Sequence, residues 1–468
     1  MTAINKKSDL TQGPLLSKII LFSLPLMATG ILQLLFNTAD TIVVGRWGGD
    51  SVQARESALA AVGSCGSLIN LIVSLFMGLS AGTGVCMAHA IGAKQEKDAE
   101  RVVHTAVITA VISGTFVTVI GLLFAPSLLK LMNTPESVLD QAVPYICAYF
   151  CGMPANMLYN YCAAILRSSG DTTRPMLFLS IAGVVNVILN LIMVLVFHMG
   201  ALGVGIATAA SHWVSGILIL LHMLHIEDYC HLDLKKLTLH IPTMKRIFSI
   251  GIPAGIQSTF FALSNMIIQS SVNTFGDVVI AGNSASNNLG NYIYTCQNAF
   301  YHTAMTFVGQ NIGAKKIDRV KKSILYCIGV VTVVGLVVGN TIYLFGSPLL
   351  RIFAPDNTAV VEAGMVRLAI LAPTYFMLGI MDVENGTLRA FGKSLTPMIV
   401  TLAGSCLLRI IWIYTVFRAY REQQIIYYSY PISWCLTALV LLAFVIFAYR
   451  EFKRKEQIES KPFDSLTE

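Results

Sequence analysis

The tetrapeptide Ile-Gly-Ala-Lys occupies residues 91–94 and again residues 312–315, an offset of 221. A second motif, Leu-Arg-Ser-Ser-Gly at 166–170, returns as Leu-Arg-Ala-Phe-Gly at 388–392, an offset of 222. Each copy is followed five residues later by Pro-Met. One copy of each motif lies in each half of the chain. A repeat of this size predicts two matching bundles of secondary structure.

The composition indicates that these bundles lie in a lipid bilayer. The chain has 468 residues, of which 55% are hydrophobic and only 12% are charged, whereas a soluble domain has about 25% charged residues. A membrane-spanning helix needs roughly 20 mostly apolar residues. Twelve such segments lie near residues 15–44, 57–88, 102–125, 138–165, 176–198, 201–226, 244–274, 279–309, 322–346, 358–388, 395–417 and 426–449. The sequence therefore predicts an all-α integral membrane protein with twelve transmembrane helices.

The polar stretch 227–243 separates the two copies of the repeat. We therefore expect an N-terminal six-helix lobe over 1–226, a cytoplasmic interlobe linker over 227–243, a C-terminal six-helix lobe over 244–449 and a cytoplasmic tail over 450–468. An even number of spans per half predicts parallel repeats, with a pseudo-two-fold axis along the membrane normal. Two such lobes around a central cleft are typical of a transporter that works by alternating access.

The net charge of +7 is a topology signal. Of the 32 Lys and Arg residues, 24 fall in alternate connections that we assign to the cytoplasm, including Lys6, Lys7 and Lys461. Seven fall outside, including Arg367, and Arg409 lies within a span. This bias follows the positive-inside rule and places both termini in the cytoplasm. It argues against nucleic-acid binding, and the ten cysteines, mostly within spans, are interpreted as small packing residues.

Several motifs resemble one known family. Asn-Thr-Ala-Asp at 37–40 with Val-Gly at 44–45 is similar to the first-helix signature of multidrug and toxic compound extrusion (MATE) transporters. The repeated Ile-Gly-Ala-Lys and Leu-Arg-x-x-Gly motifs resemble loops of the same family. The resemblance covers essentially the whole chain. It implies a two-lobed exporter in the plasma membrane of a prokaryote, which moves lipophilic organic cations or drug-like compounds and is driven by proton or sodium entry.

A carboxylate inside a span is costly and is a functional candidate by default. Asp40 is the strongest candidate, and Asn37, Asp40 and Thr41 share one helix face. Asn186 and Asn190 share a face of the fifth span in the same way. Thr208 follows in the sixth span.

These oxygen-bearing side chains predict a cation-coupling site for a proton with bridging water or for Na⁺, with Asp40, Asn186 and Asn190 as the metal ligands in the sodium case. The alternative is that Asp40 is a buried, hydrogen-bonded structural acid. By resemblance, Asp40, Asn186, Asn190 and Thr208 fall where the amino-lobe cation site of several MATE proteins lies. That site often has a second carboxylate at the position of Asn190, so the choice between H⁺ and Na⁺ stays open.

Asp382 in the tenth span is a second coupling candidate, and its repeat mate is Asn160. Many family members place a functional acid in this helix. Others place a glutamate in the seventh helix, where this chain has Phe261. Arg409 is expected to pair with Asp382 or Glu384, which would make that acid a structural ion pair rather than a coupling site.

The eighth span has an aromatic cluster, formed by Tyr292, Tyr294, Gln297, Phe300 and Tyr301. Aromatic faces attract organic cations by about 0.5–2 kcal/mol each. We therefore predict a substrate-binding role for this cluster, with packing in the bundle or exposure to lipid as the alternative.

Pro25 and Pro253 occupy matching positions in the first and seventh spans. Proline frees a backbone carbonyl and permits a helix to bend. We predict that both are hinges that couple cation binding to the shape of the cleft, and a static kink is the alternative.

The chain has no Gly-x-x-x-x-Gly-Lys-Ser/Thr phosphate loop and no evident nucleophile constellation. We therefore expect no enzymatic activity and no cofactor other than the coupling ion. The expected partners are small-molecule cargo and membrane lipid, and the expected functional unit is a monomer. The leading hypothesis is a secondary active efflux antiporter. A lipid-linked precursor flippase is the runner-up, and a channel is third.

Overall fold

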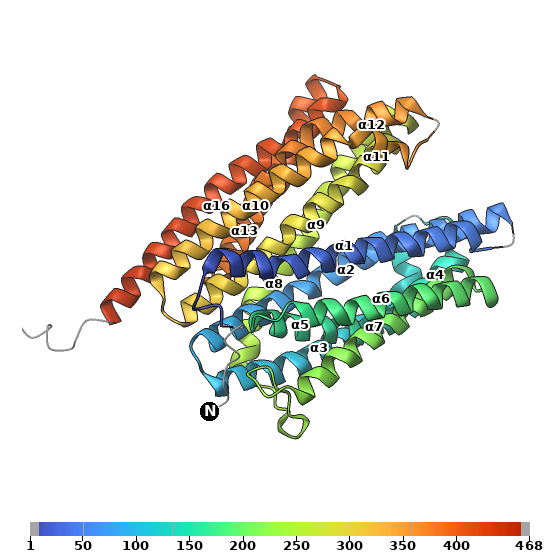
Figure 1. Cartoon of the computed structure of the whole chain (residues 1–468). Helices are drawn as coiled ribbons and strands as arrows, with labels where there is room; N and C mark the ends of the chain where they lie inside the picture. Colours follow the sequence, from blue (N-terminus) through green and yellow to red (C-terminus); the bar gives the residue numbers. More distant parts are fainter. Residues whose placement is uncertain (1–8, 50, 133, 356, 460–468) are drawn as a thin grey trace, which may run out of the picture. The chain divides into compact units, whose positions relative to one another are not determined.

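The computed structural model describes residues 9–49, 51–132, 134–355 and 357–459, and within them all regular structure is helical (Figure 1). Lys6, Lys7 and Lys461 of the charge count lie outside the described residues, as does the end of the predicted tail from residue 460.

The described residues of the first half form seven α-helices. They are α1 (Leu15–Trp47), α2 (Val52–Gly92), α3 (Glu96–Leu131), α4 (Glu136–Cys151), α5 (Met153–Ser168), α6 (Thr173–Leu191) with its π-helical continuation η1 (Ile192–Val196), and α7 (Gly200–His225).

The second half is more subdivided. It contains η2 (Leu234–Lys236), α8 (Ile241–Val272), η3 (Asn273–Phe275), α9 (Asp277–Gly313), α10 (Ile317–Leu344), α11 (Gly346–Arg351), α12 (Thr358–Leu371), η4 (Ala372–Thr374), α13 (Tyr375–Ala390), α14 (Leu395–Thr401), η5 (Leu402–Leu407), α15 (Leu408–Trp412), η6 (Ile413–Phe417) and α16 (Gln423–Glu459).

The predicted fold class is confirmed. Each of the twelve apolar segments coincides with one helix or with a run of consecutive helices. Within the described residues, ten spans are long and apolar enough to cross a membrane. The other two are the α4–α5 pair, interrupted at Gly152, and α9, which buries the amides of Asn283, Gln297 and Gln310. Helices satisfy their backbone hydrogen bonds internally, as an apolar chain in lipid requires.

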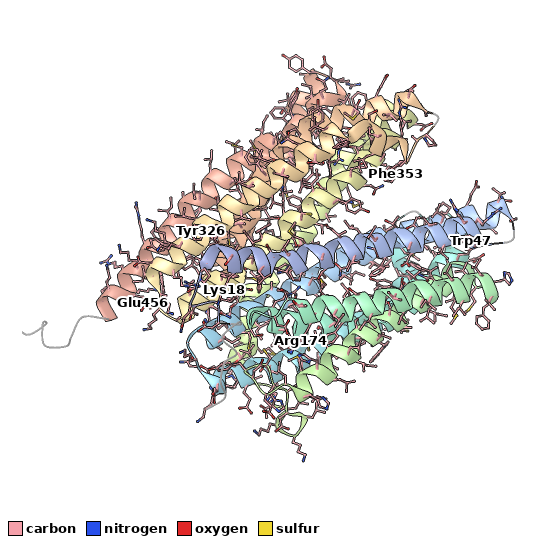
Figure 2. All side chains as sticks on the ribbon, in the orientation of Figure 1. Lys18, Trp47, Arg174, Tyr326, Phe353 and Glu456 are labelled. Carbon is pink, nitrogen blue, oxygen red and sulfur yellow. The ribbon has the colours of Figure 1, made fainter. Side chains whose placement is uncertain are left out.

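Large apolar side chains lie on the surface of the helices, as lipid contact requires. Trp47, Tyr326 and Phe353 are examples, and all three are exposed (Figure 2). In water such a surface would be an aggregation hazard, whereas in a bilayer it is the normal exterior. The chain is a multi-pass membrane protein.

Contacts group the chain into two units. Unit 1 includes Ala28–Met87 and Gln95–Thr259, and unit 2 includes Leu10–Met27, Ala88–Lys94 and the chain from Phe260 onward. Helices α1 and α8 therefore each contribute to both units, and α2 gives its last residues to unit 2. The predicted lobes 1–226 and 244–449 are continuous stretches of sequence, whereas the two units are defined by contacts between residues. The predicted lobes therefore stay a prediction.

Within unit 1, α2 and α8 approach closely through glycines. A Cβ atom on Gly78 would lie 2.2 Å from the backbone nitrogen of Gly255, and one on Gly82 would lie 2.2 Å from the carbonyl oxygen of Ile247. Small residues permit such backbone contact in membrane helices, where dispersion and weak hydrogen bonds replace the hydrophobic effect. These glycines therefore fix the α2–α8 packing.

Within unit 2, the two copies of the Ile-Gly-Ala-Lys turn lie against each other. A Cβ atom on Gly92 would lie 2.0 Å from the carbonyl oxygen of Gln310, and one on Gly313 would lie 2.3 Å from that of His89. Lys94 and Lys315 both adopt the left-handed backbone conformation, with φ of 57° and 56°. The sequence repeat is thus also a repeat of backbone geometry.

The start of the described chain is fastened to the helix that follows the second turn. The Arg319 guanidinium donates to the carbonyl oxygens of Leu10, Gln12 and Gly13, at distances between 3.0 and 3.3 Å. Deeper in unit 2, the Phe22 ring meets the Phe307 ring edge to face at 5.4 Å. The first part of α1 therefore belongs to the core of unit 2.

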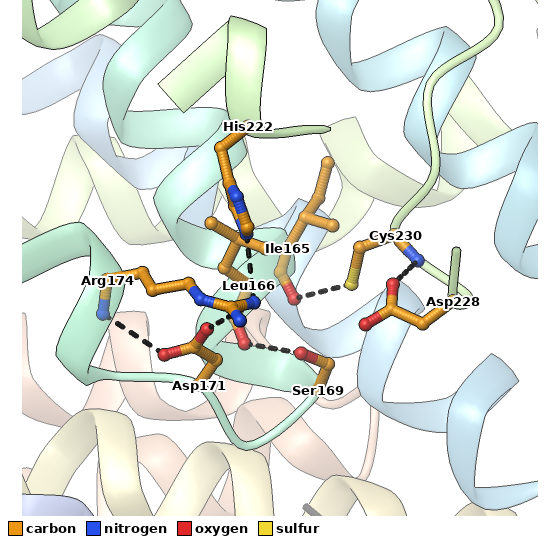
Figure 3. Close-up of polar contacts among 8 residues, drawn as sticks. All are labelled: Ile165, Leu166, Ser169, Asp171, Arg174, His222, Asp228 and Cys230. Atoms are coloured by element: carbon orange, nitrogen blue, oxygen red, sulfur yellow. Dashed lines mark hydrogen bonds and ion pairs between the residues drawn. The ribbon is translucent and has the colours of Figure 1, made fainter. Parts of the chain in front are cut away.

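The connection between the halves lies along unit 1. The backbone N–H of His240 donates to Thr105 Oγ1 at 3.2 Å, and Lys236 forms an ion pair with Glu100 at 3.6 Å. Figure 3 shows the nearby turn after α5, where Arg174 contacts Asp171.

In the same connection, burial raises the pKa of the Cys230 thiol well above its ordinary value. The Cys230 backbone N–H donates to Asp228 at 2.7 Å (Figure 3). This thiol is therefore expected to be unreactive at neutral pH.

Candidate cation and substrate sites

A chain of hydrogen bonds joins α1, α6 and α7 within unit 1. The Asn190 amide donates to the Asp40 carboxylate and, at 3.2 Å, to Asn186 Oδ1. The Asn186 amide donates to Thr208 Oγ1 at 3.4 Å, and this hydroxyl donates to the Val204 carbonyl oxygen at 2.8 Å. The structure thus brings together four of the predicted coupling residues, and we call them the Asp40 cluster: Asp40, Asn186, Asn190 and Thr208.

The Asp40 cluster places a carboxylate away from any cationic partner. Asn186 and Asn190 are buried and Asp40 is half-buried. Within the described residues, no Lys, Arg or His forms an ion pair with Asp40, and Asn190 Oδ1 accepts no hydrogen bond. The cluster therefore offers carboxylate and amide oxygens to a proton or to a hard cation such as Na⁺, ligands that suit both.

Asn37 and Thr41 do not join this cluster. The Asn37 side chain is exposed, and Thr41 Oγ1 donates to the Asn37 carbonyl oxygen of its own helix at 2.9 Å. Two tyrosines of α4 that sequence reasoning missed, Tyr145 and Tyr149, lie close enough to Asp40 to interact with it electrostatically. Their spacing of four residues places them on one helix face, but nothing in the sequence connects that face to Asp40.

A second polar cluster lies in the same unit around the repeat mate of Asp382. The Asn160 amide donates to Asn156 Oδ1 at 2.6 Å, and the Asn156 amide lies 3.1 Å from His212 Nε2. The His212 ring meets the Tyr149 ring edge to face at 5.6 Å. Polar groups therefore continue from the surroundings of Asp40 toward α5.

In unit 2, Asp382 lies on α13 and is half-buried. Its neighbours are Asn298, Asn385 and the guanidinium of Arg389, and its Oδ2 atom has no hydrogen-bond partner in the described part of the chain. Sequence reasoning missed Arg389 because this residue was assigned to a cytoplasmic loop. Glu384, two residues further along α13, is only 1% exposed, and its Oε2 atom accepts no hydrogen bond from the described residues.

The predicted pairing of Arg409 with Asp382 or Glu384 is wrong. Arg409 Nε donates to Ser433 Oγ at 2.7 Å, and the guanidinium lies among aromatic rings instead. The prediction failed because Asp382 faces α9 and Arg389, whereas Arg409 faces α16. Arg367 is also corrected: it lies not in an outer connection but buried in α12, where it donates to Asn287 at 2.9 Å.

The five residues of the predicted aromatic cluster on α9 differ in burial and in their neighbours. Gln297 and Phe300 are fully buried, and Phe300 belongs to the core that holds the start of α1. Tyr301 is buried beneath Arg389, whose guanidinium carbon lies 5.2 Å from the ring centre. Tyr294 is 39% exposed and Tyr292 is half-buried. The cargo-binding role of the five residues stays a prediction.

Both candidate hinges lie inside continuous helices, Pro25 in α1 and Pro253 in α8. Helix α1 passes from unit 2 to unit 1 between Met27 and Ala28, two residues beyond Pro25. A point where packing partners change is a suitable place for bending. The hinge role itself stays a prediction.

Helices of this length, with a polar cluster around an intramembrane carboxylate, define a membrane transport protein. The MatE family model matches residues 25–192 and 253–415, one match in each half and most of the chain in total. The chain therefore belongs to the MatE family of multidrug and toxic compound extrusion transporters.

Similar proteins agree with this assignment. The chain is 26% identical over 452 residues to "Probable multidrug resistance protein YoeA" of Bacillus subtilis, which covers 92% of this chain and 93% of that protein. It is 25% identical over 413 residues to a protein of Shewanella oneidensis named FAD transporter, covering 86% and 88% of the two chains. A solved multidrug resistance MATE family transporter in an outward-facing conformation superposes with a TM-score of 0.88 at 21% identity, covering 96% of this chain and 99% of that one.

Proposed function

We propose that this protein is a secondary active exporter that exchanges lipophilic or cationic organic compounds for H⁺ or Na⁺ across the plasma membrane. The observation that carries this proposal is the Asp40 cluster, in which the carboxylate of a membrane helix contacts an amide and, within the described part of the chain, no cationic side chain. The cost of an acid in such a place favours a functional role. Curated relatives named as multidrug resistance proteins support the export of drug-like compounds.

The hydrogen bond between Asp40 and Asn190 gives the coupling ion a way to act on the helices. An ionised Asp40 accepts the Asn190 amide and thereby joins α1 to α6. A proton on the carboxylate removes its negative charge, and Na⁺ competes with the amide for the same oxygen. Either ion therefore changes the contact of α1 with α6, and the bend that Pro25 permits would carry the change along α1.

Asp382 is less suited to be the main coupling site. The positive charge of Arg389 lies beside it and offsets its attraction for a cation. We therefore assign the driving cation to the Asp40 cluster. We give Asp382 a role in orienting Arg389 and Tyr301, because the Arg389 guanidinium also donates to the Tyr301 hydroxyl.

Anionic organic cargo is the second candidate. Unit 2 buries Arg367, Arg389 and Arg409 within its helices, and one relative is named FAD transporter. A lipid-linked precursor flippase also requires basic groups for phosphate-bearing cargo. These arginines belong to unit 2 and the Asp40 cluster belongs to unit 1, so anionic cargo and cation coupling would rest on different residues.

The test is reconstitution of the purified protein in vesicles, with proton and sodium gradients imposed separately and efflux of a fluorescent organic cation followed. We expect one gradient to drive efflux and Asp40→Asn to lower the rate at least about tenfold, since the neutral isostere cannot exchange a proton or compensate Na⁺. Glu362→Gln, which neutralises an exposed carboxyl group, is the matched control. An efflux rate that depends on neither gradient, or that is unchanged in Asp40→Asn, would contradict the proposal.

A further inference from the structure

Arg409 is a buried cation that no carboxylate of the described residues accompanies. It is 0% exposed, although it lies in the middle of the apolar span Leu395–Phe417. Its Nε atom donates to Ser433 Oγ at 2.7 Å. Within the described residues, the titratable groups that interact with it electrostatically are Tyr430, Cys406 and Tyr375. None of these is an acid that is ionised under ordinary conditions.

Three aromatic rings surround the guanidinium. Its central carbon lies 4.4 Å from the ring centre of Tyr430, 5.3 Å from that of Phe261 and 5.6 Å from that of Trp434. A ring face attracts a cation through its quadrupole and so offsets part of the charge. A ring face above the guanidinium does not accept hydrogen bonds from its N–H groups, because these lie in the guanidinium plane and point outward.

Those N–H groups have no partner. Arg409 Nη1 and Nη2 are buried and donate to no atom of the described residues. The Trp434 indole Nε1 in the same neighbourhood is also buried and has no partner among the described residues, and the buried Ser264 hydroxyl meets only the weakly hydrogen-bonding thiol of Cys406. Ser264 lies beside Cys406, one turn before Arg409. Unpaired hydrogen-bond donors are therefore concentrated around one positive charge.

Arg367, another buried arginine of unit 2, does not share this arrangement. Arg367 is also buried in unit 2, but its terminal nitrogens donate to Ser286 at 3.4 Å and to Asn287 at 2.9 Å. A buried charge without compensation is strongly unfavourable, and arginine does not become neutral in a protein. Arg409 therefore requires a partner that the described chain does not supply.

The local backbone and the sequence repeat point to the same place. Arg409 lies in the short α15 between two π-helical segments, η5 and η6. Such irregular turns are frequent at functional sites of helices. At the repeat offset of 222, Arg409 corresponds to Val187, the neighbour of Asn186 in the Asp40 cluster. The position that carries a charge in the second half is therefore apolar in the first half.

We infer that Arg409 is the centre of a binding site for one monovalent anionic group, either a free halide such as chloride or the carboxylate of an organic molecule. One guanidinium supplies one positive charge, which matches a monovalent group. The two terminal nitrogens form a fork that fits a carboxylate or holds a single ion between them. Trp434 and Ser264 supply further donors, and the aromatic rings form apolar walls that suit a small or planar group.

This site is independent of the proposed cation coupling. Cation-driven efflux depends on Asp40 in unit 1, whereas anion binding depends on Arg409 in unit 2. Anion binding is measured without any gradient, so the two proposals fail in different experiments.

The first experiment measures thermal unfolding of the full-length protein in detergent, at constant sodium and ionic strength. Chloride and benzoate are each titrated against gluconate, whose bulky polyhydroxyl chain an aromatic enclosure excludes. Because a ligand that binds only the folded state raises the unfolding midpoint, we expect chloride, benzoate or both to raise it by several degrees. A response to chloride identifies a free ion, and a response to benzoate alone identifies an organic carboxylate. No response to either anion would overturn the inference.

Variants then assign the response to the site. Arg409→Met removes the charge and is expected to abolish the response and to be at least as stable as the parent in gluconate, because an apolar residue needs no counter-ion. Arg367→Lys is the matched control and is expected to retain the full response. A response that persists in Arg409→Met places the anion elsewhere and overturns the inference.

A measurement on the parent protein keeps the inference testable if Arg409→Met does not fold. Crystals equilibrated with bromide are expected to show an anomalous peak within hydrogen-bond distance of Arg409 Nη1 or Nη2 when chloride raises the midpoint. If benzoate alone does so, its density is expected at the same nitrogens. A ligand bound only at other positions would overturn the inference.

Discussion

At the scale of single residues, Asp40 and Asn190 show how far side-chain chemistry can be inferred from spacing. Asn186 and Asn190 are four residues apart on a helix, so their shared face was predictable, and the structure joins them at 3.2 Å. Asp40 lies 150 positions before Asn190, and only folding brings the two together. The exposed position of Asn37 was not predictable, because two residues three apart on a helix can lie on either side of the boundary between its buried and exposed faces.

The amide of Asn190 is predicted to position the coupling carboxylate. Asn190→Leu removes the hydrogen bond to Asp40 and the amide oxygen offered to the cation, so we expect cation-driven efflux to fall about tenfold or more. Asn340→Leu is the matched control, because the half-buried Asn340 amide donates to its own helix, at the Leu336 carbonyl oxygen. Equal efflux rates in the two variants would show that Asn190 has no part in coupling.

Glu384 is predicted to be dispensable for transport. It is buried, and its Oε2 atom has no partner among the described residues. The isosteric Glu384→Gln therefore removes an uncompensated carboxyl group without removing a bond. We expect an unchanged or higher unfolding temperature and an unchanged efflux rate, measured in the same vesicle assay. A large loss of efflux at unchanged stability would instead place Glu384 in the coupling machinery.

At the scale of helices, apolar segment length was sufficient to predict all twelve spans, because a bilayer-spanning helix must satisfy its own backbone and present an apolar surface. The interruptions were not predictable. The break at Gly152 between α4 and α5 and the π-helical turns around Arg409 arise where side chains of neighbouring helices must fit. Packing between helices, rather than propensity along one helix, decides such details.

The α2–α8 contact makes a stability prediction. Gly78→Ala places a methyl group 2.2 Å from a backbone nitrogen that cannot move independently, so the helices must separate. We expect a loss of about 1–3 kcal/mol in the free energy of unfolding, seen as a lower unfolding temperature.

Gly63→Ala is the control in the same helix, because a Cβ atom there meets nothing within 4 Å. It should be neutral or stabilising by up to about 1 kcal/mol through better helix propensity. A destabilisation of equal size in both variants would contradict the close-packing explanation.

The hinge hypothesis makes a different prediction. Pro25→Ala removes the flexibility that the proline allows in α1 and is expected to slow efflux several-fold while leaving the unfolding temperature unchanged or raised, because alanine is the better helix former. Pro126→Ala in α3 is the control for replacing a proline inside a helix. Unimpaired efflux in Pro25→Ala would favour a static kink.

At the scale of the whole molecule, the duplication has a structural counterpart in the paired Ile-Gly-Ala-Lys turns of unit 2, which share the same backbone conformation. The mismatches between the halves are equally informative. Asp40 corresponds to Ile268, and Arg409 corresponds to Val187. An acid in one half and a base in the other indicate that the halves have different chemical roles.

The orientation in the membrane follows from the charge count and is directly testable. Because 24 of the 32 Lys and Arg residues fall in connections assigned to the cytoplasm, we expect green fluorescent protein fused to the C-terminus to be fluorescent and alkaline phosphatase fused there to be inactive. The reverse pair of results would place the C-terminus outside and contradict the assignment.

The sequence by itself determined the membrane class, the twelve spans, the internal repeat and the scarce intramembrane acids, because these depend on composition and on periodicity along one chain. Only the tertiary structure decided which polar groups meet. It joined Asp40 to Asn190, gave Asp382 the neighbour Arg389, and left Arg409 among aromatic rings without an acid. The physical reason is that the partner of a buried charge depends on how each helix is rotated about its axis relative to its neighbours. The apolar periodicity of the sequence does not specify this rotation closely enough to identify the partner.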